Sequence, residues 1–133
     1  MNIQQIYKLA IELGIKNDFR PKAQIQKQLK RIKEKYEKLS KEHKEVFDLE
    51  KLISPYSDTR IHFDNGIKNV KRIMVGIDID SADMMVARYL SNHNPKDPID
   101  LVINHHPIGK ALMDLGDVMH LQADVLSQYG VPI

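Results

Sequence analysis

The sequence predicts an α/β fold in which a helical hairpin extension over residues 1–54 precedes a βαβ unit with a parallel sheet. In the first part, apolar residues recur at helical spacing, with long charged side chains between them. The second part, residues 55–133, contains two short apolar runs separated by a helical pattern. Charge divides the chain similarly, because residues 1–53 carry 13 Lys and Arg against 8 Asp and Glu, whereas residues 54–133 carry 7 against 10. We therefore expect a helical attachment followed by a partial domain that carries the chemistry.

The extension is predicted to form two helices. The first has apolar residues at helical spacing, and Gly14 offers a place for it to end. The second is expected to start near Pro21 and to present a heptad-like seam of Ile25, Leu29, Ile32, Tyr36 and Leu39. The simplest interpretation packs Leu9 and Leu13 against this seam. A basic face for nucleic acid is the weaker alternative, because glutamates interrupt the lysines at Glu34, Glu37 and Glu42.

The predicted βαβ unit begins at Val70. Both faces of the predicted first strand are apolar, with Ile73, Val75, Ile77 and Ile79 on one face and Met74 and Gly76 on the other. We therefore expect a strand that is covered on both sides. Asp80 or Ser81 can cap a following helix, whose apolar stripe contains Ala82, Met85, Val86, Tyr89 and Leu90. Residues 99–103 form the second run, and the strand–helix–strand order predicts parallel strands.

One further helix is predicted near the end of the chain. It starts near Asp114 or Asp117, and Gly130 is placed to cap it. Residues 131–133 then begin what should be a third strand. Earlier in the chain, polar and apolar residues alternate over residues 60–63, which is typical of a short strand. Because a doubly wound sheet rarely ends on the first residues of a strand, we expect the chain to be a fragment or the first piece of a longer protein.

Composition excludes several classes of function. The 133 residues include no Cys, which excludes disulfide scaffolds, Cys-ligated zinc, iron–sulfur clusters and thiol nucleophiles. A net charge of +2 argues against a protein that coats nucleic acid or binds membranes through a polybasic surface. No apolar run approaches the roughly 20 residues that span a bilayer, and the N-terminus lacks the apolar centre of a signal peptide. We expect a soluble, cytoplasmic protein without membrane or nucleic-acid partners.

The candidate site lies where the two predicted strands end. Asp78, Asp80 and Ser81 follow the first strand, and Asn104-His105-His106-Pro107 follows the second. Ligands of open parallel sheets gather beyond the carboxyl ends of the strands, and imidazole is a common ligand of first-row metal ions. His105 and His106 are therefore predicted to hold divalent metal ions, and each ring can take one of two nearby ions. Zinc, iron and manganese are not distinguished.

Other interpretations of these residues remain open. A His-His pair after a strand is commonly just a turn, and Asp78 and Asp80 are more often helix caps than ligands. His120 on the last helix is more simply a partly buried histidine. Because two imidazoles cannot complete a coordination sphere, the remaining ligands must come from Asp residues, His120 or sequence beyond Ile133. Asp78 or Asp80 can instead orient a histidine that binds the metal.

Residues 70–133 resemble the Nif-three-like family, also described as GTP cyclohydrolase 1 type 2-like or dinuclear-metal-centre proteins. The resemblance is carried by the strand from Val70 to Asp78 and by the segment Asp100-Leu101-Val102-Ile103-Asn104-His105-His106-Pro107. The residues Ser54 to Arg60, Ser-Pro-Tyr-Ser-Asp-Thr-Arg, look like the end of an extension found in one branch of that family. The resemblance implies an α/β fold, two metal ions and an oligomer, often a ring-like hexamer.

Within that resemblance, His105 and His106 match the first two metal ligands of the family. The other family ligands, an Asp in a later His-Thr segment and a His and Glu near the C-terminus, have no counterpart in these 133 residues. We therefore expect an incomplete dinuclear centre.

Three hypotheses of function follow. The first is a metal-dependent hydrolase that acts on an unidentified small molecule, with catalytic residues not assigned. The second is a non-enzymatic interaction or regulatory module that assembles through its N-terminal helices. The third is a structural fragment whose missing half holds the function. A homo-oligomer is expected in the first two.

Overall fold

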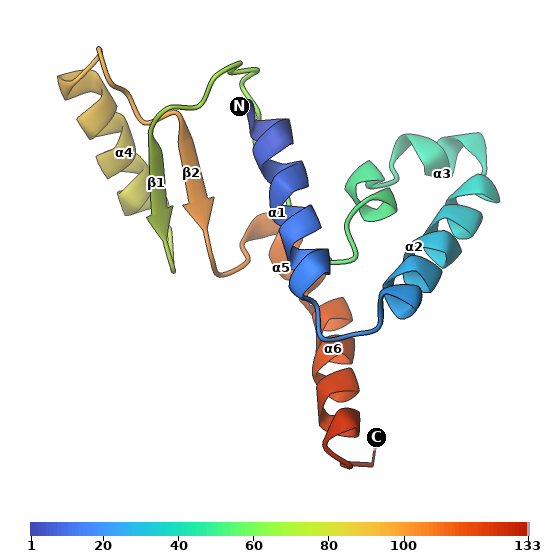
Figure 1. Cartoon of the computed structure of the whole chain (residues 1–133). Helices are drawn as coiled ribbons and strands as arrows, with labels where there is room; N and C mark the ends of the chain where they lie inside the picture. Colours follow the sequence, from blue (N-terminus) through green and yellow to red (C-terminus); the bar gives the residue numbers. More distant parts are fainter. Residues whose placement is uncertain (133) are drawn as a thin grey trace. The chain divides into compact units, whose positions relative to one another are not determined.

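The computed structural model describes residues 1–132, which contain both helices and a parallel sheet (Figure 1). This confirms the general α/β class. The chain forms two compact units, each built from two separate stretches of sequence. The first unit contains Met1–Leu9 and Ile61–Ile108, and the second contains Ala10–Arg60 together with the segment that starts at Gly109. Helix α1, Ile3–Asn17, begins in the first unit and ends in the second.

The first unit holds the predicted βαβ arrangement. Strand β1, Ile73–Gly76, runs parallel to β2, Leu101–Asn104, with Ile73 opposite Leu101 and Gly76 opposite Asn104. Helix α4, Ser81–His93, connects them and lies beside β1 in Figure 1. The prediction of parallel strands joined by a helix is therefore confirmed.

Asp100 fixes the start of both strands. Its Oδ2 accepts hydrogen bonds from the backbone N–H groups of Lys71, at 2.7 Å, and Arg72, at 3.1 Å. These two hydrogen bonds hold the pKa of the Asp100 carboxyl below its usual value, because they favour the charged form. One short carboxylate thus aligns the chain before β1 with the chain before β2.

The prediction that β1 is covered on both faces is wrong for the described residues. Ile73, Val75 and Ile77 are 44%, 68% and 62% exposed, whereas Met74 and Gly76 on the other face are half-buried. Only Ile79 from the predicted stripe is buried, and it packs over Gly76 because the chain bends after the strand ends. The apolar stripe of α4 is also exposed, since the helix buries Ala87 instead. Two apolar faces of this unit are therefore open to solvent.

The second unit is built from helices. It contains the end of α1 and five further helical segments: α2 (Lys22–Glu37), α3 (Lys41–Glu45), the 3₁₀ helix η1 (Leu49–Leu52), α5 (Gly109–Met113) and α6 (Leu115–Gln128). The α2 seam is the more buried face of that helix, as predicted, with Ile25 fully enclosed. The segment that follows α2 packs on this seam, where the ring centroids of Tyr36 and Phe47 lie 4.8 Å apart.

The predicted packing of Leu9 and Leu13 is wrong. Both are exposed, and α1 instead buries Ile3, Tyr7 and Ile11, which follow one another at steps of four. Apolar residues surround more than half of this helix, so spacing alone does not decide which face is buried. Helix α1 also continues through Gly14. A Cβ at that position would lie 2.8 Å from the Tyr56 ring, so glycine is required there by packing rather than by a helix end.

The C-terminal predictions are partly confirmed. Helix α6 follows Asp114, and Gly130 has a φ of 80°, as expected after a helix end. The preceding α5 was not predicted. Val131 and Pro132 belong to no strand, nor do residues 60–63, while Ile133 lies outside the described residues. Within residues 1–132, every helix is too short or too polar to cross a membrane.

Candidate metal centre

His105 and His106 extend the parallel pairing beyond the last residues of the strands. The backbone N–H of His105 donates to the carbonyl of Gly76 at 2.9 Å, and that of His106 donates to the carbonyl of Ile77 at 2.8 Å. Both imidazole rings are exposed. The backbone therefore fixes the two histidines at the carboxyl edge of the sheet while their rings stay accessible to a ligand.

The ring of His106 is oriented by Asp78. Its Nδ1 lies 2.6 Å from Asp78 Oδ1, and the two side chains are 55% and 78% exposed. Because a carboxylate oxygen can only accept, Nδ1 of His106 donates in this contact, and in a neutral imidazole the lone pair then lies on Nε2. Histidines that bind metals almost always donate their other ring N–H to a carboxylate or carbonyl in this way.

The two rings lie close together. The centroids of His105 and His106 are 5.2 Å apart, and their planes are inclined by 34°. Successive residues in a strand point to opposite faces, but the chain bends after Asn104, so the rings can approach each other. The arrangement offers two imidazoles to the same region of solvent.

Asp80 acts as a helix cap. Its carboxylate accepts from the backbone N–H groups of Ala82, at 2.7 Å, and Asp83, at 3.2 Å. Asp83 in turn accepts from the backbone N–H of Asp80 at 3.0 Å, which completes a capping box at the start of α4. The capping interpretation of Asp80 is therefore confirmed, and Asp78 is the acid that reaches a histidine.

Asn104 contributes a buried polar group next to the pair. Its Oδ1 accepts from the backbone N–H of Ile79 at 2.9 Å and so ties the chain after β1 to the end of β2. Its Nδ2 is buried and has no hydrogen-bond partner among residues 1–132. A buried donor without a partner is uncommon and is often found near functional sites.

The described residues do not form a complete metal site. Within residues 1–132, no group of three or more His, Asp or Glu side chains is placed to hold one ion. His120, which the sequence offered as a further ligand, belongs to α6 in the second unit. The histidine pair thus supplies two donors, fewer than the three protein ligands of a catalytic zinc site.

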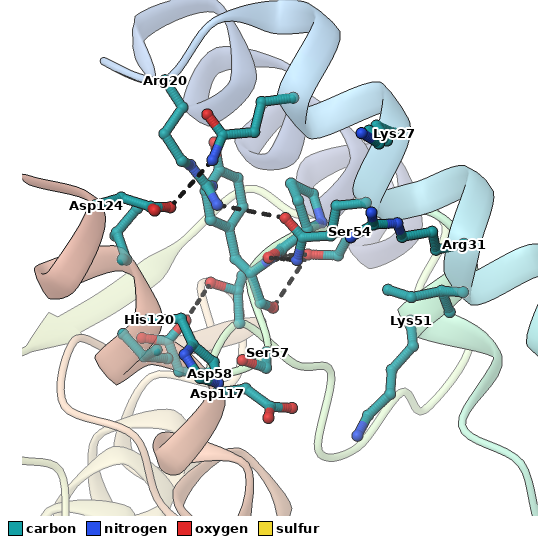
Figure 2. Close-up of a pocket in the computed structure, with 18 of the residues that line it drawn as sticks. Arg20, Lys27, Arg31, Lys51, Ser54, Ser57, Asp58, Asp117, His120 and Asp124 are labelled. Atoms are coloured by element: carbon teal, nitrogen blue, oxygen red, sulfur yellow. Dashed lines mark hydrogen bonds between the residues drawn. The ribbon is translucent and has the colours of Figure 1, made fainter. Parts of the chain in front are cut away.

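The second unit contains a cavity of about 800 Å³ that the sequence did not reveal. It is lined by α2, by α6 and by the Ser54–Arg60 loop, and Figure 2 shows side chains from all three. Helix α2 contributes Lys27, Arg31 and Lys35 to the lining, while α6 contributes Asp117, His120 and Asp124. No local pattern could have indicated this cavity, because its walls are far apart in the sequence.

Buried ion pairs hold the loop of this cavity. The Arg60 side chain is fully enclosed, with Nε 3.1 Å from Asp48 Oδ2 and a second nitrogen 3.4 Å from Asp114 Oδ2. It also donates to the carbonyls of Tyr56 and Thr59, each at 2.9 Å. Burial raises the pKa of Asp114, but Lys51 and Arg60 more than offset this, so the net direction is downward.

A second buried pair lies at Asp18. Its carboxylate accepts from the guanidinium of Arg20, at 2.8 and 3.0 Å, and from the hydroxyl of Tyr56 at 3.0 Å. The hydrogen bonds of Arg20 lower the pKa of Asp18 although burial opposes them. Burial, with Asp18 adding to it, raises the pKa of Tyr56 to about 12. The loop is thus anchored at Tyr56 as well as at Arg60.

Comparisons of the chain with protein-family models, with curated proteins and with solved structures give no match. Function is therefore inferred from the residues themselves.

Proposed function

We propose that the protein binds divalent metal ions through His105 and His106 and acts as a metal-dependent hydrolase of the Nif-three-like type. The observation that supports this most strongly is the 2.6 Å contact between Asp78 and Nδ1 of His106. A hydrogen bond between two exposed side chains adds little to stability. This contact does, however, prepare Nε2 of His106 to donate its lone pair to a metal ion.

The donor set fits a metal ion in part. Neutral imidazoles suit zinc, iron and manganese to different degrees, and both rings are exposed at the sheet edge where ligands gather. Two protein donors are enough to anchor an ion but leave most of its coordination sphere open. We propose that a second copy of this chain or another polypeptide supplies the remaining donors, which agrees with the expected oligomer.

Each residue has a distinct role in this proposal. His105 and His106 hold the ions, while Asp78 orients the ring of His106 and raises its basicity. Asn104 ties the chain after β1 to the end of β2 through its hydrogen bond with Ile79, and so supports the sheet edge that carries both histidines. A bound divalent ion would polarise the substrate and lower the pKa of water.

Metal content tests the binding part of the proposal. Wild-type protein, His105→Ala/His106→Ala and the control His62→Ala/His93→Ala are equilibrated with zinc, manganese or iron and dialysed, and bound metal is measured by mass spectrometry. We expect wild type and control to retain the same amount of one metal and the His105/His106 variant to lose it. Equal retention by all three proteins would contradict the proposal.

The hydrolase part needs a separate assay. GTP is the substrate that the cyclohydrolase resemblance implies, so its consumption is followed with each metal by liquid chromatography. Turnover by wild type and by the control, lost in His105→Ala/His106→Ala, supports hydrolysis at this site. Turnover that persists in the variant shows that the histidine pair does not carry the reaction.

Assembly through the helices is the second candidate function. It is favoured by Leu9 and Leu13, which are 43% and 49% exposed and lie four residues apart on α1. A second copy of the chain can cover such a pair. Leu9→Lys/Leu13→Lys should then reduce the sedimentation coefficient without changing metal content, and an unchanged coefficient would contradict this role.

A further inference from the structure

The cavity of the second unit has one wall of cations without acidic partners. Lys27, Arg31 and Lys35 follow one another at steps of four on α2, so their side chains share one face and are about 6 Å apart along the axis. None of the three forms an ion pair with another of the residues 1–132. Other cations of the cavity are already neutralised, since Arg20 pairs with Asp18 and Lys51 with Asp114.

The facing wall is acidic. Asp117, His120 and Asp124 lie on one face of α6, and Asp58 joins them from the loop. Figure 2 shows Lys27 and Arg31 on one side of the cavity and these α6 residues on the other. Asp124 also accepts a hydrogen bond from Gln24 at 3.3 Å, which links the two walls. The cavity therefore has a cationic end and an end rich in hydrogen-bond acceptors.

We propose that this cavity binds a small molecule with a phosphate group at one end and hydroxyl groups at the other, such as a sugar phosphate. A phosphomonoester carries almost two negative charges and three acceptor oxygens, which match the three free cationic groups of α2. Hydroxyl groups donate hydrogen bonds to carboxylates such as Asp117. The volume of about 800 Å³ lies within the usual range for small-molecule sites.

The acidic wall distinguishes this ligand from a nucleic acid. A polynucleotide is bound through a continuous series of phosphate contacts, and the carboxylates of α6 would repel its backbone. In a sugar phosphate, the single phosphate meets the cations at one end of the cavity, and only the uncharged hydroxyl groups face the acids. This site is independent of the histidine pair, which belongs to the first unit.

Isothermal titration calorimetry of the full chain tests the proposal, with D-ribose 5-phosphate, inorganic phosphate and D-ribose as probes. The variant Lys27→Gln/Arg31→Gln removes two charges from the cavity. Its control, Lys22→Gln/Lys33→Gln, removes two charges from the opposite face of α2. Circular dichroism confirms that each variant is folded.

Ribose 5-phosphate should bind more tightly than inorganic phosphate, and ribose should bind weakest. The cavity variant should raise the dissociation constant for ribose 5-phosphate by about tenfold or more, because two charge-assisted contacts are lost. The control should change it less than about twofold. Asp117→Asn should weaken ribose 5-phosphate but not inorganic phosphate, since only the hydroxyl contact is removed.

Any of three results would overturn the proposal. One is the absence of any heat of binding for both phosphate-bearing probes in wild type. The second is an equal loss of affinity in the cavity variant and the control, which shows that phosphate binding follows net charge rather than the cavity. The third is an equal loss of affinity for ribose 5-phosphate and inorganic phosphate in Asp117→Asn, which contradicts a site with two distinct ends.

Discussion

Removing Asp78 is predicted to weaken metal binding without unfolding the protein. Asp78 contacts Nδ1 of His106 at 2.6 Å, but 78% of the Asp78 side chain is exposed. An exposed ion pair contributes about 0–1 kcal/mol to the free energy of unfolding, so Asp78→Ala should shift the melting temperature by a few degrees at most. Loss of a carboxylate that orients a ligand histidine lowers metal affinity by about 10- to 100-fold, or about 1.4–2.7 kcal/mol.

Two measurements separate these effects. Calorimetric titration with zinc gives the dissociation constant, and thermal unfolding followed by circular dichroism gives the melting temperature. Asp97→Ala is the matched control, because it removes another exposed acid that pairs with Arg72 at the opposite end of the strands. An unchanged dissociation constant in Asp78→Ala, or the same change in the control, would refute the role of Asp78.

Three further predictions concern the scaffold. Asp18→Asn should lower the free energy of unfolding by about 3–5 kcal/mol in a urea titration, because it leaves Arg20 charged and only 8% exposed; a loss below about 1 kcal/mol would argue that water reaches this pair. Gly76→Ala should cost about 1–3 kcal/mol in the same assay, since a Cβ would collide with the buried Ile79 side chain; wild-type stability would show that Ile79 yields. The pKa of Tyr56, about 12 in the folded protein, exceeds the unfolded value of about 10, so folding keeps the phenol protonated. The stabilising effect of this protonation is complete below pH 10 and declines as the pH rises from about 10 to about 12. Tyrosinate absorbance and unfolding measurements over this pH range test the prediction. A Tyr56→Phe variant should lack the loss of stability that Tyr56 causes.

The sequence was sufficient for the strands, the connecting helix and the place of the histidines. The apolar run of β1 and the cap at Asp80 are local patterns, and local patterns translate directly into local structure. The two acids after β1 were also identified as a cap and as a partner for a histidine. Which acid does which was not predictable, because it depends on the bend that follows Gly76.

Long-range packing explains what the sequence did not reveal. Leu9 and Leu13 satisfy a helical pattern as well as Tyr7 and Ile11 do, and only tertiary contacts decide which pair is buried. The cavity of the second unit depends on α2 and α6, which are far apart in the chain. Ion pairs such as Arg60 with Asp114 likewise join distant segments and leave no periodic signal.

The central claim is that His105 and His106 bind a metal ion, and anomalous diffraction tests it most directly. Crystals of the full chain are soaked in zinc or manganese, and data are collected on both sides of the absorption edge of the metal. We expect an anomalous peak about 2.0–2.1 Å from Nε2 of His106, with a nitrogen of His105 bound to the same ion or to a second one nearby. A metal peak elsewhere, with both imidazoles free of metal, would contradict the claim.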